Sequence, residues 1–567
     1  MAWYLADYGY IISHTHVACV LLLRRMARQE SATSLLDLPD ECLLAVLQCC
    51  AADDQRSVCS AARAHSRLHQ AALAALSSIT AVVPTQQQLD DVLCYVEYHD
   101  CHINSLDLTG LTGSREGFWN AHIWELFPSW SESPSLASLQ LNRFIVQLQA
   151  CDRFAGVLGA AAQVAALTKL TLRNCNVPCS FQLSEGSKAL AASISLLPTG
   201  LQHLSLDSLH TNNSTSRWLR LPTGELQRLQ QLTYLELAKV HLRGPDKATP
   251  PLQPLQALTR LVDLRILMGG DDADRGYDEY GVPASMLSGV KHLTRLQLSG
   301  CRLAAGALAG VIQLQHLHVK GVRHQPRDRA AGAGAAEATS LLSNLQPLQQ
   351  LTFLCLLGAL QSYGDSTPPA AAYAALTASS KLVQLDLTGC ALPASAWRQM
   401  FPVGRQLPHL QRLDMTSVTQ RYAVVPDFIP LVACCPGLQC LYMGGWQDYY
   451  RGPRWSIPTA AGGPRRSTLA PLQGLSALHT LHLAPHHPVE KAIIESRQLT
   501  GLRQLHLDFP QSVWSLQRAL AESLTQMTQL TALSYQGPRN DERVEMKCEV
   551  SADWSLLTSH ISQSCYV

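Results

Sequence analysis

Two histidines, His482 and His506, are the pair of residues whose spacing most suggests chemistry. Each stands between two leucines, so the two side chains hold equivalent positions in two segments that would be neighbouring strands. Neighbouring strands lie about 4.8 Å apart, which would let the two imidazoles meet. A metal site needs a fixed number of ligands with supporting hydrogen bonds, and two histidines alone do not provide them. The sequence therefore favours solvated histidines here, and also at His316 and His318 beside Lys320.

Carboxylates concentrate in residues 268–282, where five acidic side chains fall close together. Their order lacks the spacing of a Ca²⁺-binding loop, so the favoured interpretation is a solvated acidic loop and no metal site is predicted. The chain also lacks the phosphate-binding, serine-hydrolase and zinc-hydrolase motifs that would position a nucleophile, a base or a bound nucleotide. We therefore expect no catalytic residue, no cofactor and no enzymatic activity.

Cysteine is the other residue type with chemical potential, and the chain has 18 of them. No C-x-x-C pair recurs with zinc spacing, which favours reduced thiols in a cytoplasmic and/or nuclear protein. Three cysteines share one position of a repeated phrase, namely Cys175, Cys301 and Cys390. At that position we expect the side chain to meet backbone groups inside a turn.

Side chains suited to protein binding gather between Gly444 and Thr468. Trp, Tyr and Arg are enriched at binding hot spots because they bury much surface and add directed polar contacts. The residues that carry this prediction are Trp446, Tyr449, Tyr450, Arg451, Arg454 and Trp455. Asp386, Asp414 and Tyr442 are expected beneath this segment, and together the two groups form the predicted target-binding site. The alternative is that the two tryptophans pack onto a sheet edge and the arginines are solvated.

The overall charge excludes some partners. Lys and Arg number 44 against 43 Asp and Glu, so the formal net charge is only +1. No global basic field exists to recruit nucleic acid or an anionic membrane. The apolar run at residues 17–23 is far shorter than the roughly 20 residues of a transmembrane helix. We therefore predict neither nucleic-acid binding nor membrane insertion.

The elements that would position these side chains are set by one repeated phrase, L-x-x-L-x-L-x-x-C. It is clearest from Leu293 to Cys301 and returns from Leu382 to Cys390. Leucines two apart point to the same face of a strand, and such a strand buries its leucines only by stacking on neighbouring copies. This is the signature of a leucine-rich repeat. A helical leucine-rich protein would leave the period of about 30 residues unexplained.

The apolar part of this phrase, L-x-x-L-x-L with equivalents at some positions, has fifteen candidates near one period, which predicts about fifteen strands in one continuous parallel sheet. The first apolar residues of the copies are Ile103, Leu136, Leu167, Leu201, Leu232, Leu261, Leu293, Leu314, Leu351, Leu382, Leu410, Leu438, Leu478, Leu502 and Leu530. Spacing near 30 residues with helical connections predicts an α/β horseshoe solenoid, with the sheet inside and helices outside. The residues between the strand leucines would then form a mixed polar column on the concave face, from Asp107 to Ser534.

Three of the connections between strands carry predictions about their structure. Residues 252–258 are short and carry proline, which predicts only a turn or two of helix. Only 21 residues separate Leu293 from Leu314, so a helix hardly fits there. Residues 321–340 are rich in glycine and alanine, and we predict that this stretch is flexible.

The segment before the repeats carries a helical pattern and a motif. Pro39 and two acids suit a helix start, and apolar residues recur at helical spacing through about residue 76. The segment resembles an F-box, whose pattern is matched by Leu38, Pro39, Glu41, Leu43, Val46, Leu47 and Asp54, with Arg67 and Leu68 closing the motif. Two positions depart from the family: Gln55 replaces a leucine and His65 replaces a tryptophan. The alternative is a plain helical cap on the solenoid.

The resemblance implies a substrate receptor of an SCF-type (Skp–cullin–F-box) ubiquitin ligase. The F-box would dock a Skp-family adaptor, and through it a cullin, while the repeats hold an unknown target protein for ubiquitination and proteasomal degradation. Adaptor binding would fall on Leu38, Pro39, Glu41, Leu43, Val46 and Leu47. Because three short helices cannot bury every apolar face, we expect Leu38, Pro39, Leu43 and Leu47 to form an exposed patch. The second hypothesis is a non-catalytic interaction scaffold that keeps the helices as a cap.

The domain prediction has five parts along the chain. A disordered extension covers residues 1–33, and an F-box-like helical domain covers 34–80. A linker or cap follows at 81–102, and the repeats occupy 103–537. Residues 538–567 are polar and form a C-terminal cap or tail.

Overall fold

The computed structural model describes the strands of every repeat and parts of their connections. The described residues are 40, 43–44, 46–47, 50, 58, 61, 64–75, 78–83, 88, 92, 103–110, 136–142, 167–173, 176–177, 197–207, 210–211, 220–221, 223–239, 241–242, 253–268, 280–282, 286–321, 333–360, 368–416, 428–443, 469–483, 498–508, 527 and 529–536. The chain divides into two compact units, Met1–Leu261 and Val262–Val567. The predicted extension at 1–33 and tail at 538–567 lie outside the described residues.

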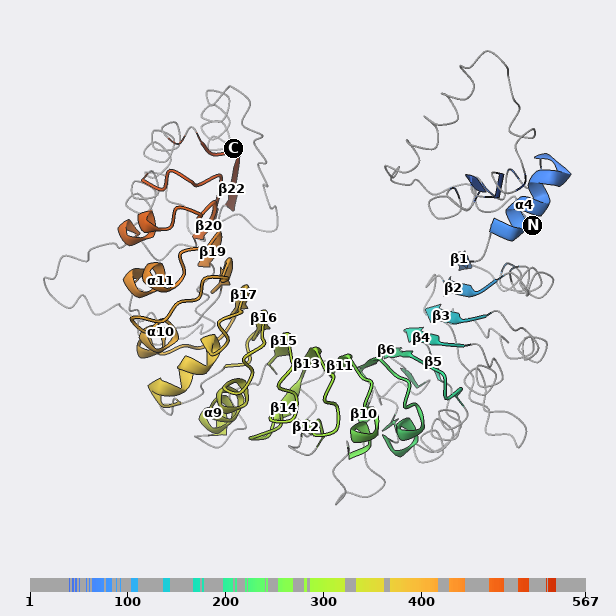
Figure 1. The fold of residues 1–567 in the computed structure, drawn as a ribbon, viewed down its shortest axis with the longest axis horizontal. Helices are drawn as coiled ribbons and strands as arrows, with labels where there is room; N and C mark the ends of the chain where they lie inside the picture. The colour runs from blue at the N-terminus through green and yellow to red at the C-terminus, as the bar shows by residue number, and fades with distance from the viewer. Residues whose placement is uncertain are drawn as a thin grey trace, which may run out of the picture. The chain divides into compact units, whose positions relative to one another are not determined.

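The first unit contains the opening strands of the ladder. In order they are β1 (Ser78–Val83), β2 (Ser105–Gly110), β3 (Ser138–Asn142), β4 (Lys169–Arg173), β6 (His203–Asp207) and β9 (Tyr234–Ala238). Each strand is parallel to the next and pairs with it residue by residue. Sequence neighbours are therefore spatial neighbours, as expected of stacked repeats (Figure 1).

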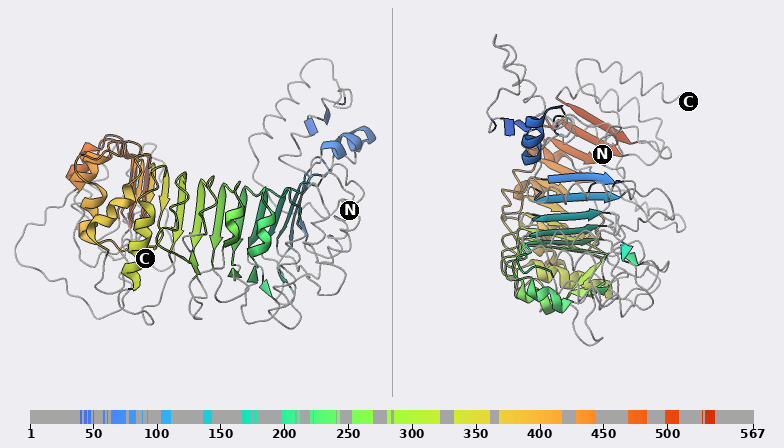
Figure 2. Two further views of the ribbon diagram at one scale, coloured as in Figure 1. Left: turned by 60° about the horizontal axis from the view of Figure 1, so that its bottom comes forward. Right: turned by 90° about the vertical axis from the view of Figure 1, so that its right-hand side faces the viewer.

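The second unit continues the same pattern. Its strands are β11 (Asp263–Leu267), β13 (Arg295–Ser299), β15 (His316–Lys320), β16 (Phe353–Cys355), β17 (Gln384–Asp386), β18 (Arg412–Asp414), β19 (Cys440–Met443), β20 (Thr480–Leu483), β21 (Gln504–Asp508) and β22 (Ala532–Gln536). All of the pairings between consecutive strands are parallel (Figure 2). Between them the two units hold 16 main strands among the described residues. The predicted open, all-parallel sheet is therefore confirmed, with a strand in all fifteen predicted repeats, and it is consistent with an α/β solenoid.

One main strand was not predicted. β1 spans the end of the predicted helical domain and the start of the predicted linker, and it pairs along its whole length with β2. Its sequence, SITAVV, lacks the leucine phrase but is rich in the β-branched residues that strands favour. The sheet thus begins at Ser78 rather than at Ile103.

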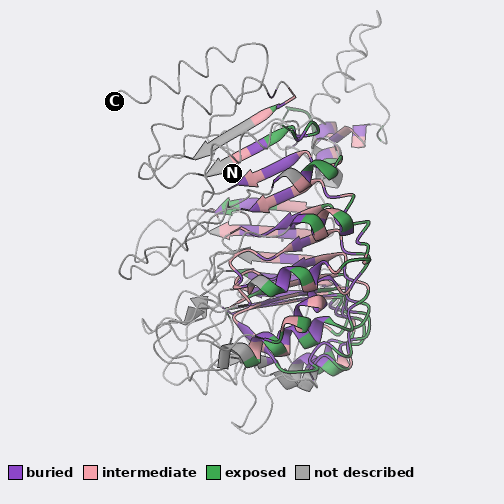
Figure 3. Cartoon of the chain, turned by 90° about the vertical axis from the view of Figure 1, so that its left-hand side faces the viewer, coloured by how far each residue is buried: buried purple, intermediate pink, exposed green. Residues whose placement is uncertain are grey.

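Buried leucines alternate with polar residues along the strands. Leu385 is fully buried between Gln384 and Asp386, and the same alternation repeats in the neighbouring strands (Figure 3). The first leucine of each phrase is buried as well, since Leu293, Leu382 and the other members are at most a few per cent exposed. Burying a leucine side chain stabilises a fold by about 1.5–3 kcal/mol, so each added repeat contributes its own share of the core.

Threonines directly after the first leucine join consecutive repeats. The Thr294 hydroxyl donates to the Val262 carbonyl at 3.3 Å, and the Thr352 hydroxyl donates to the Gln315 carbonyl at 3.2 Å. The same bond is formed by Thr168, Thr233 and Thr531. The recurring Leu-Thr pair thus has a physical role, because the hydroxyl adds a third hydrogen bond to a carbonyl that already accepts two backbone amides where the strand begins.

Glycine and cysteine form the turn that follows the strand. Gly300 and Gly389 have φ angles of +69° and +71°, which side chains with a Cβ rarely adopt. The next residue turns its sulfur inward: Cys390 Sγ lies 2.7 Å from the Leu356 carbonyl, and Cys301 Sγ lies 3.5 Å from the Ser299 carbonyl. The predicted contact of these two cysteines with backbone groups is confirmed, while Cys175 lies outside the described residues. Among the described cysteines none is in a disulfide.

Short helices and turns return the chain to the next strand. The described ones are η4 (Thr223–Arg228), η5 (Gln253–Ala257), α9 (Ala333–Leu345), η7 (Ala370–Thr377), α10 (Ala394–Met400), α11 (Phe428–Cys434) and η8 (Ala470–Gly474). η5 confirms the single short helical turn predicted for residues 252–258. Between Leu293 and Leu314 the connection consists of turns and the short strand β14, so the expectation that no helix fits is also confirmed. In the second unit α9, α10 and α11 lie on one side of the strand row (Figure 1).

The prediction of a flexible 321–340 stretch was wrong for its second half. α9 begins at Ala333 and buries Ala338, Leu341, Leu342 and Leu345. Alanine has the highest helix propensity, and the leucines at helical spacing give the helix an apolar face. Asn344, only 1% exposed, fixes the helix by donating to the Ala304 carbonyl at 2.8 Å and accepting from the Leu308 amide at 3.1 Å.

Three further strand pairs lie outside the main sheet and were not predicted. They are parallel pairs of β5 (Asn176–Val177) with β7 (His210–Thr211), β10 (His241–Leu242) with β8 (Arg220–Leu221), and β12 (Tyr280–Val282) with β14 (Cys301–Leu303). In each pair at least one strand begins within three residues of the end of a main strand. They are too short to carry a recognisable sequence period, which explains why the sequence did not indicate them.

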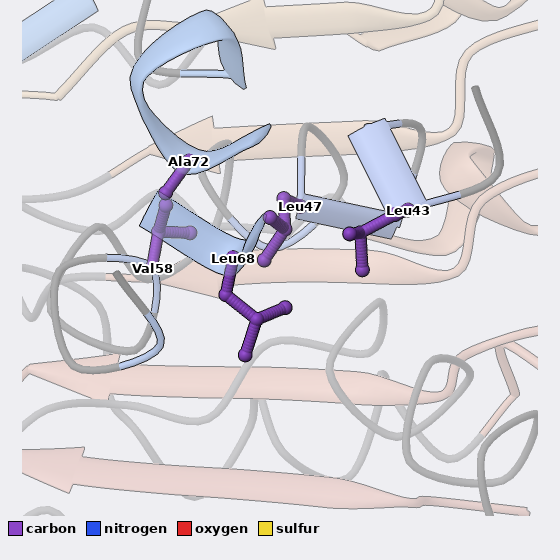
Figure 4. Packing of buried hydrophobic residues seen from close by; sticks show 5 residues of the cluster. All are labelled: Leu43, Leu47, Val58, Leu68 and Ala72. Atoms are coloured by element: carbon purple, nitrogen blue, oxygen red, sulfur yellow. The ribbon is translucent and has the colours of Figure 1, made fainter. Parts of the chain in front are cut away.

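The N-terminal helical residues form a small core of their own. Leu43, Leu47, Val58, Leu68 and Ala72 cluster together, the last two from α4 (Ser66–Ala75) (Figure 4). Leu43 is 0% exposed and Leu47 is 3% exposed. The prediction that these two leucines belong to an exposed patch was therefore wrong, because the helices pack them against each other. Leu38 and Pro39, the other predicted members, lie outside the described residues.

His65, which departs from the F-box pattern, stands immediately before α4. Its Nδ1 atom accepts the Arg67 backbone amide at 3.1 Å, which satisfies one of the amides that a helix start leaves open. The Arg67 side chain pairs with Asp40 at 2.6 Å, and this exposed pair contributes little to stability. No described helix is both long and apolar enough to cross a membrane.

Candidate functional site

The candidate site is the polar face of the strands, whose residues form one continuous row in each unit. In the second unit the strand pairing aligns Arg265, Gln297, His318, Cys355, Asp386, Asp414, Tyr442, His482, His506 and Ser534. In the first unit it aligns Asp107, Gln140, Thr171, Ser205 and Glu236. This confirms the predicted column member by member, because strands with matched leucines can pair in only one register without exposing them.

Asp386 and Asp414, predicted to contact a target, are engaged by the protein itself. The Asp386 carboxylate accepts the Thr388 amide at 2.9 Å, and the Asp414 carboxylate accepts the Thr416 amide at 3.0 Å. The Thr388 hydroxyl also donates to Asp414 at 3.2 Å. Each aspartate thus closes the turn that ends its own strand, a use of Asp that competes with binding of an external partner.

Arg412 connects Asp414 to the aromatic part of the row. Its guanidinium lies 3.6 Å from the Asp414 carboxylate and 4.5 Å above the centre of the Tyr442 ring. The pKa of Tyr442 is raised mainly by burial, while the nearby Arg412 charge opposes the shift. The ring is therefore a neutral, half-buried surface whose orientation is fixed by the arginine stacked on it.

His482 and His506 lie beside each other, as their positions predicted. Their ring centroids are 5.9 Å apart and the rings are inclined by 70°, while Tyr442 meets His482 edge-on at 6.0 Å. The three rings form an aromatic strip across β19, β20 and β21. Within the described part of the chain, no group of three or more His, Cys, Asp or Glu side chains could hold a metal ion. The geometry of these histidines is that of ring packing.

The thiol in the row is not a nucleophile. Cys355 is 4% exposed and its sulfur lies 3.5 Å from the Asp386 carboxylate. Burial, with the Asp386 charge second, raises the pKa of Cys355 to about 12. Nucleophilic cysteines need a lowered pKa and access to solvent, and Cys355 has neither.

A basic group on β13 and β15 was noticed in the sequence only as a set of solvated side chains. We define the basic face as Arg295, His316, His318 and Lys320. The two histidines are partly exposed, and Arg295 and Lys320 are exposed. Burial is the main cause that lowers the pKa of each histidine, helped by Arg295 at His316 and by Lys320 at His318.

A polar cluster in the first unit was missed by the sequence analysis. The Glu236 carboxylate, 7% exposed, accepts the Tyr234 hydroxyl at 2.6 Å and the Ser205 hydroxyl at 3.0 Å. The Tyr234 ring stacks on His203 with 4.0 Å between centroids. The alternation of leucines and polar residues is enough to place these residues on the polar face. It does not show that the Tyr234 and Ser205 hydroxyls donate hydrogen bonds to Glu236.

Several predicted site residues lie outside the described part of the chain. For adaptor binding they are Leu38, Pro39 and Glu41, while Val46 is half-exposed. For target binding they are Trp446, Tyr449, Tyr450, Arg451, Arg454 and Trp455. Of the predicted target-binding residues, the described part of the chain therefore contains Asp386, Asp414 and Tyr442, which lie on neighbouring strands. No protein-family model matches the chain. A comparison with curated proteins likewise finds no match.

Proposed function

We propose that this protein is the substrate-recognition subunit of an SCF-type ubiquitin ligase. Its N-terminal helices would dock a Skp-family adaptor, and the polar face of a horseshoe of repeats would hold the target. In this role the protein positions the target and performs no bond chemistry of its own. The cytoplasm and/or the nucleus, where cysteines stay reduced, are the compartments that fit this function.

The observation that carries the proposal is the aligned polar row. In the second unit, neighbouring strands contribute charged, aromatic and amide side chains to the row. The leucines that alternate with these side chains are buried in the core. A row of this kind offers many independent contacts and no catalytic group, which suits recognition of a macromolecule. The predicted horseshoe would set the row on a concave surface.

The N-terminal core supports the adaptor part of the proposal. Leu43, Leu47 and Leu68 hold hydrophobic positions of the F-box pattern, and they pack on one another as the core of a small helical unit. The side chains left for an adaptor are then the less buried ones, including Leu44 and Val46. This refines the predicted adaptor surface.

Co-precipitation with the adaptor tests the proposal. We expect Leu44→Asp with Val46→Asp to abolish co-precipitation, and Leu38→Ala with Pro39→Ala to do the same. Gln70→Ala, an exposed change on α4, is the matched control and should leave binding intact. Circular dichroism would show that the repeats stay folded in each variant. Failure of the wild-type chain to bind any Skp-family adaptor would refute the ligase proposal.

Burial of Leu43 and Leu47 also favours a second candidate function. Helices whose leucines are buried against one another can cap the end of a solenoid. Such a cap does not require binding to an adaptor. The protein would then be a non-catalytic interaction scaffold. A chain that captures partners through its repeats but never recovers a cullin would support this second function.

The target site of the sequence analysis remains part of the proposal. It combines Asp386, Asp414 and Tyr442 with the aromatic and basic residues of the segment 444–468. Deleting residues 452–466 should change the set of proteins captured after proteasome inhibition, with adaptor binding retained. An unchanged set would remove this segment from the target site.

A further inference from the structure

We propose that the basic face binds a target segment rich in Asp and Glu, and that it binds more tightly in mildly acidic than in neutral solution. This inference rests on the proposed function, since it names the class of target segment that the repeats recognise. It differs from the predicted site at the 444–468 segment, because it uses β13 and β15 of the second unit.

The cationic side chains of this face are exposed to solvent, whereas the nearby carboxylates already bind other groups of the protein. Arg295 and Lys320 are exposed on adjacent strands. Asp263, the strand partner of Arg295 on β11, is 9% exposed, and its carboxylate pairs with Arg265 at 3.1 Å. Asp386 is held by the Thr388 amide. The surface therefore presents cations outward to an anionic partner.

The spacing of the basic face matches that of an extended peptide. His316, His318 and Lys320 alternate along β15, so neighbouring members are about 6.6 Å apart on the same side of the strand. A peptide in extended conformation also repeats its side chains on one side every two residues, about 6.6–6.8 Å apart. Alternating carboxylates could thus face His316, His318 and Lys320 in turn, and Arg295, paired with His316, adds a cation at the strand start.

The histidines give the interaction its dependence on pH. The charged groups around His316 are Arg295 and Asp263. Those around His318 are Asp386 and Lys320. Cys355, the residue of β16 that pairs with His318, stays a neutral thiol. With a lowered pKa, both imidazoles are mostly neutral at pH 7 in the unbound protein. A bound carboxylate favours the charged imidazole, so binding raises its pKa and takes up a proton. Affinity must then rise as the pH falls toward 6.

A nucleic acid fits this face less well. Only two of its four members carry a permanent charge, and the whole chain has a net charge of +1. Nucleic-acid binding draws its affinity from many simultaneous phosphate contacts. An acidic peptide needs only the few contacts that β13 and β15 supply.

Fluorescence anisotropy with the full chain tests the inference. The probe is a short labelled peptide of alternating Glu and Ser, and the control peptide alternates Gln and Ser. We expect the acidic peptide to bind about ten-fold more tightly at pH 6 than at pH 7.5, a difference of about 1.4 kcal/mol. The control peptide should not bind, and salt should weaken binding of the acidic peptide.

Variants separate the roles of the four side chains. His316→Gln with His318→Gln should remove the gain at pH 6 and leave binding at pH 7.5 within about two-fold, which is under about 0.5 kcal/mol. Lys320→Gln, at an exposed position, should weaken binding at both pH values. The matched control is His292→Gln with His409→Gln, two exposed histidines that lie outside the row, and it should keep the full gain.

Three results would overturn the inference. They are equal binding of the Gln peptide, a pH gain that survives in the His316 and His318 variant, and displacement of the peptide by an RNA oligonucleotide at equal concentration. None of these results depends on adaptor co-precipitation. A chain that binds the adaptor but not the acidic peptide would keep the proposed function and lose this inference.

Discussion

At the scale of single residues, the aspartates of the row close turns, and this role predicts how they respond to mutation. Asp414 is 8% exposed and accepts from the Thr416 amide and the Thr388 hydroxyl. Asp414→Ala leaves both donors without an acceptor, and we expect it to lower the free energy of unfolding by about 1–3 kcal/mol. Asp414→Asn keeps an acceptor oxygen and should cost clearly less. Urea unfolding measures both, and equal losses would show that the turn does not need the acceptor.

Buried thiols of the turns predict a pattern of chemical protection. Burial raises the pKa of Cys301 and Cys390 to about 12. Only the thiolate reacts with iodoacetamide, so both cysteines should stay unlabelled in the native protein at pH 8 and become labelled in urea. Mass spectrometry of the digested protein reads the two states. Rapid native labelling of Cys390 would contradict its burial.

The same thiols make stability dependent on alkaline pH. Their folded pKa of about 12 exceeds the ordinary thiol value of 9.0. The unfolded chain therefore releases these protons first, and the free energy of unfolding should fall as the pH rises from about 9 toward 12. Urea midpoints measured across that range give the slope. Cys390→Ala should reduce the slope, and an unchanged slope would assign it to other groups.

At the scale of elements, Asn344 is a buried polar anchor of α9. Asn344 joins the helix to the preceding turn by accepting from the Leu308 amide and donating to the Ala304 carbonyl. Asn344→Ala leaves the Leu308 amide without this acceptor and removes the bonds to the Ala304 and Ser340 carbonyls, and we expect a loss of about 1–3 kcal/mol. Ser343→Ala on the exposed side of the same helix is the matched control and should change stability by less than about 0.5 kcal/mol. Equal effects of the two changes in thermal unfolding would show that Asn344 is not the anchor.

The elements also show what could be predicted from the sequence. The strands and the polar row were predictable because leucines two and three apart have only one arrangement that buries them all. β1 and α9 were not, since β1 lacks the leucine phrase and α9 lies in a stretch whose glycines suggested a loop. The burial of Leu43 and Leu47 depends on which helix faces meet, and a single helix pattern does not specify that. The same limit applies to the side-chain bonds of Asp386 and Asp414.

At the scale of the whole molecule, stability is expected to be local along the ladder. Each repeat contacts its neighbours, so damage in one repeat should spread only a short way. Leu385, fully buried in β17, is a suitable probe. We expect Leu385→Asp to raise hydrogen exchange in β16, β17 and β18 while β2 and β3 keep their protection. Uniform loss of protection along the chain would indicate a single cooperative unit, and Gln384→Ala on the same strand is the control.

The alternation within each strand separates two kinds of genetic change. A substitution at Leu385 alters foldability, whereas a substitution at the neighbouring Gln384, which is half-exposed, alters only what the surface offers to other molecules. Selection can therefore act on partner preference at one set of codons while a second, interleaved set stays constrained. Over evolutionary time the surface can therefore change one strand at a time, while every successive sequence still folds.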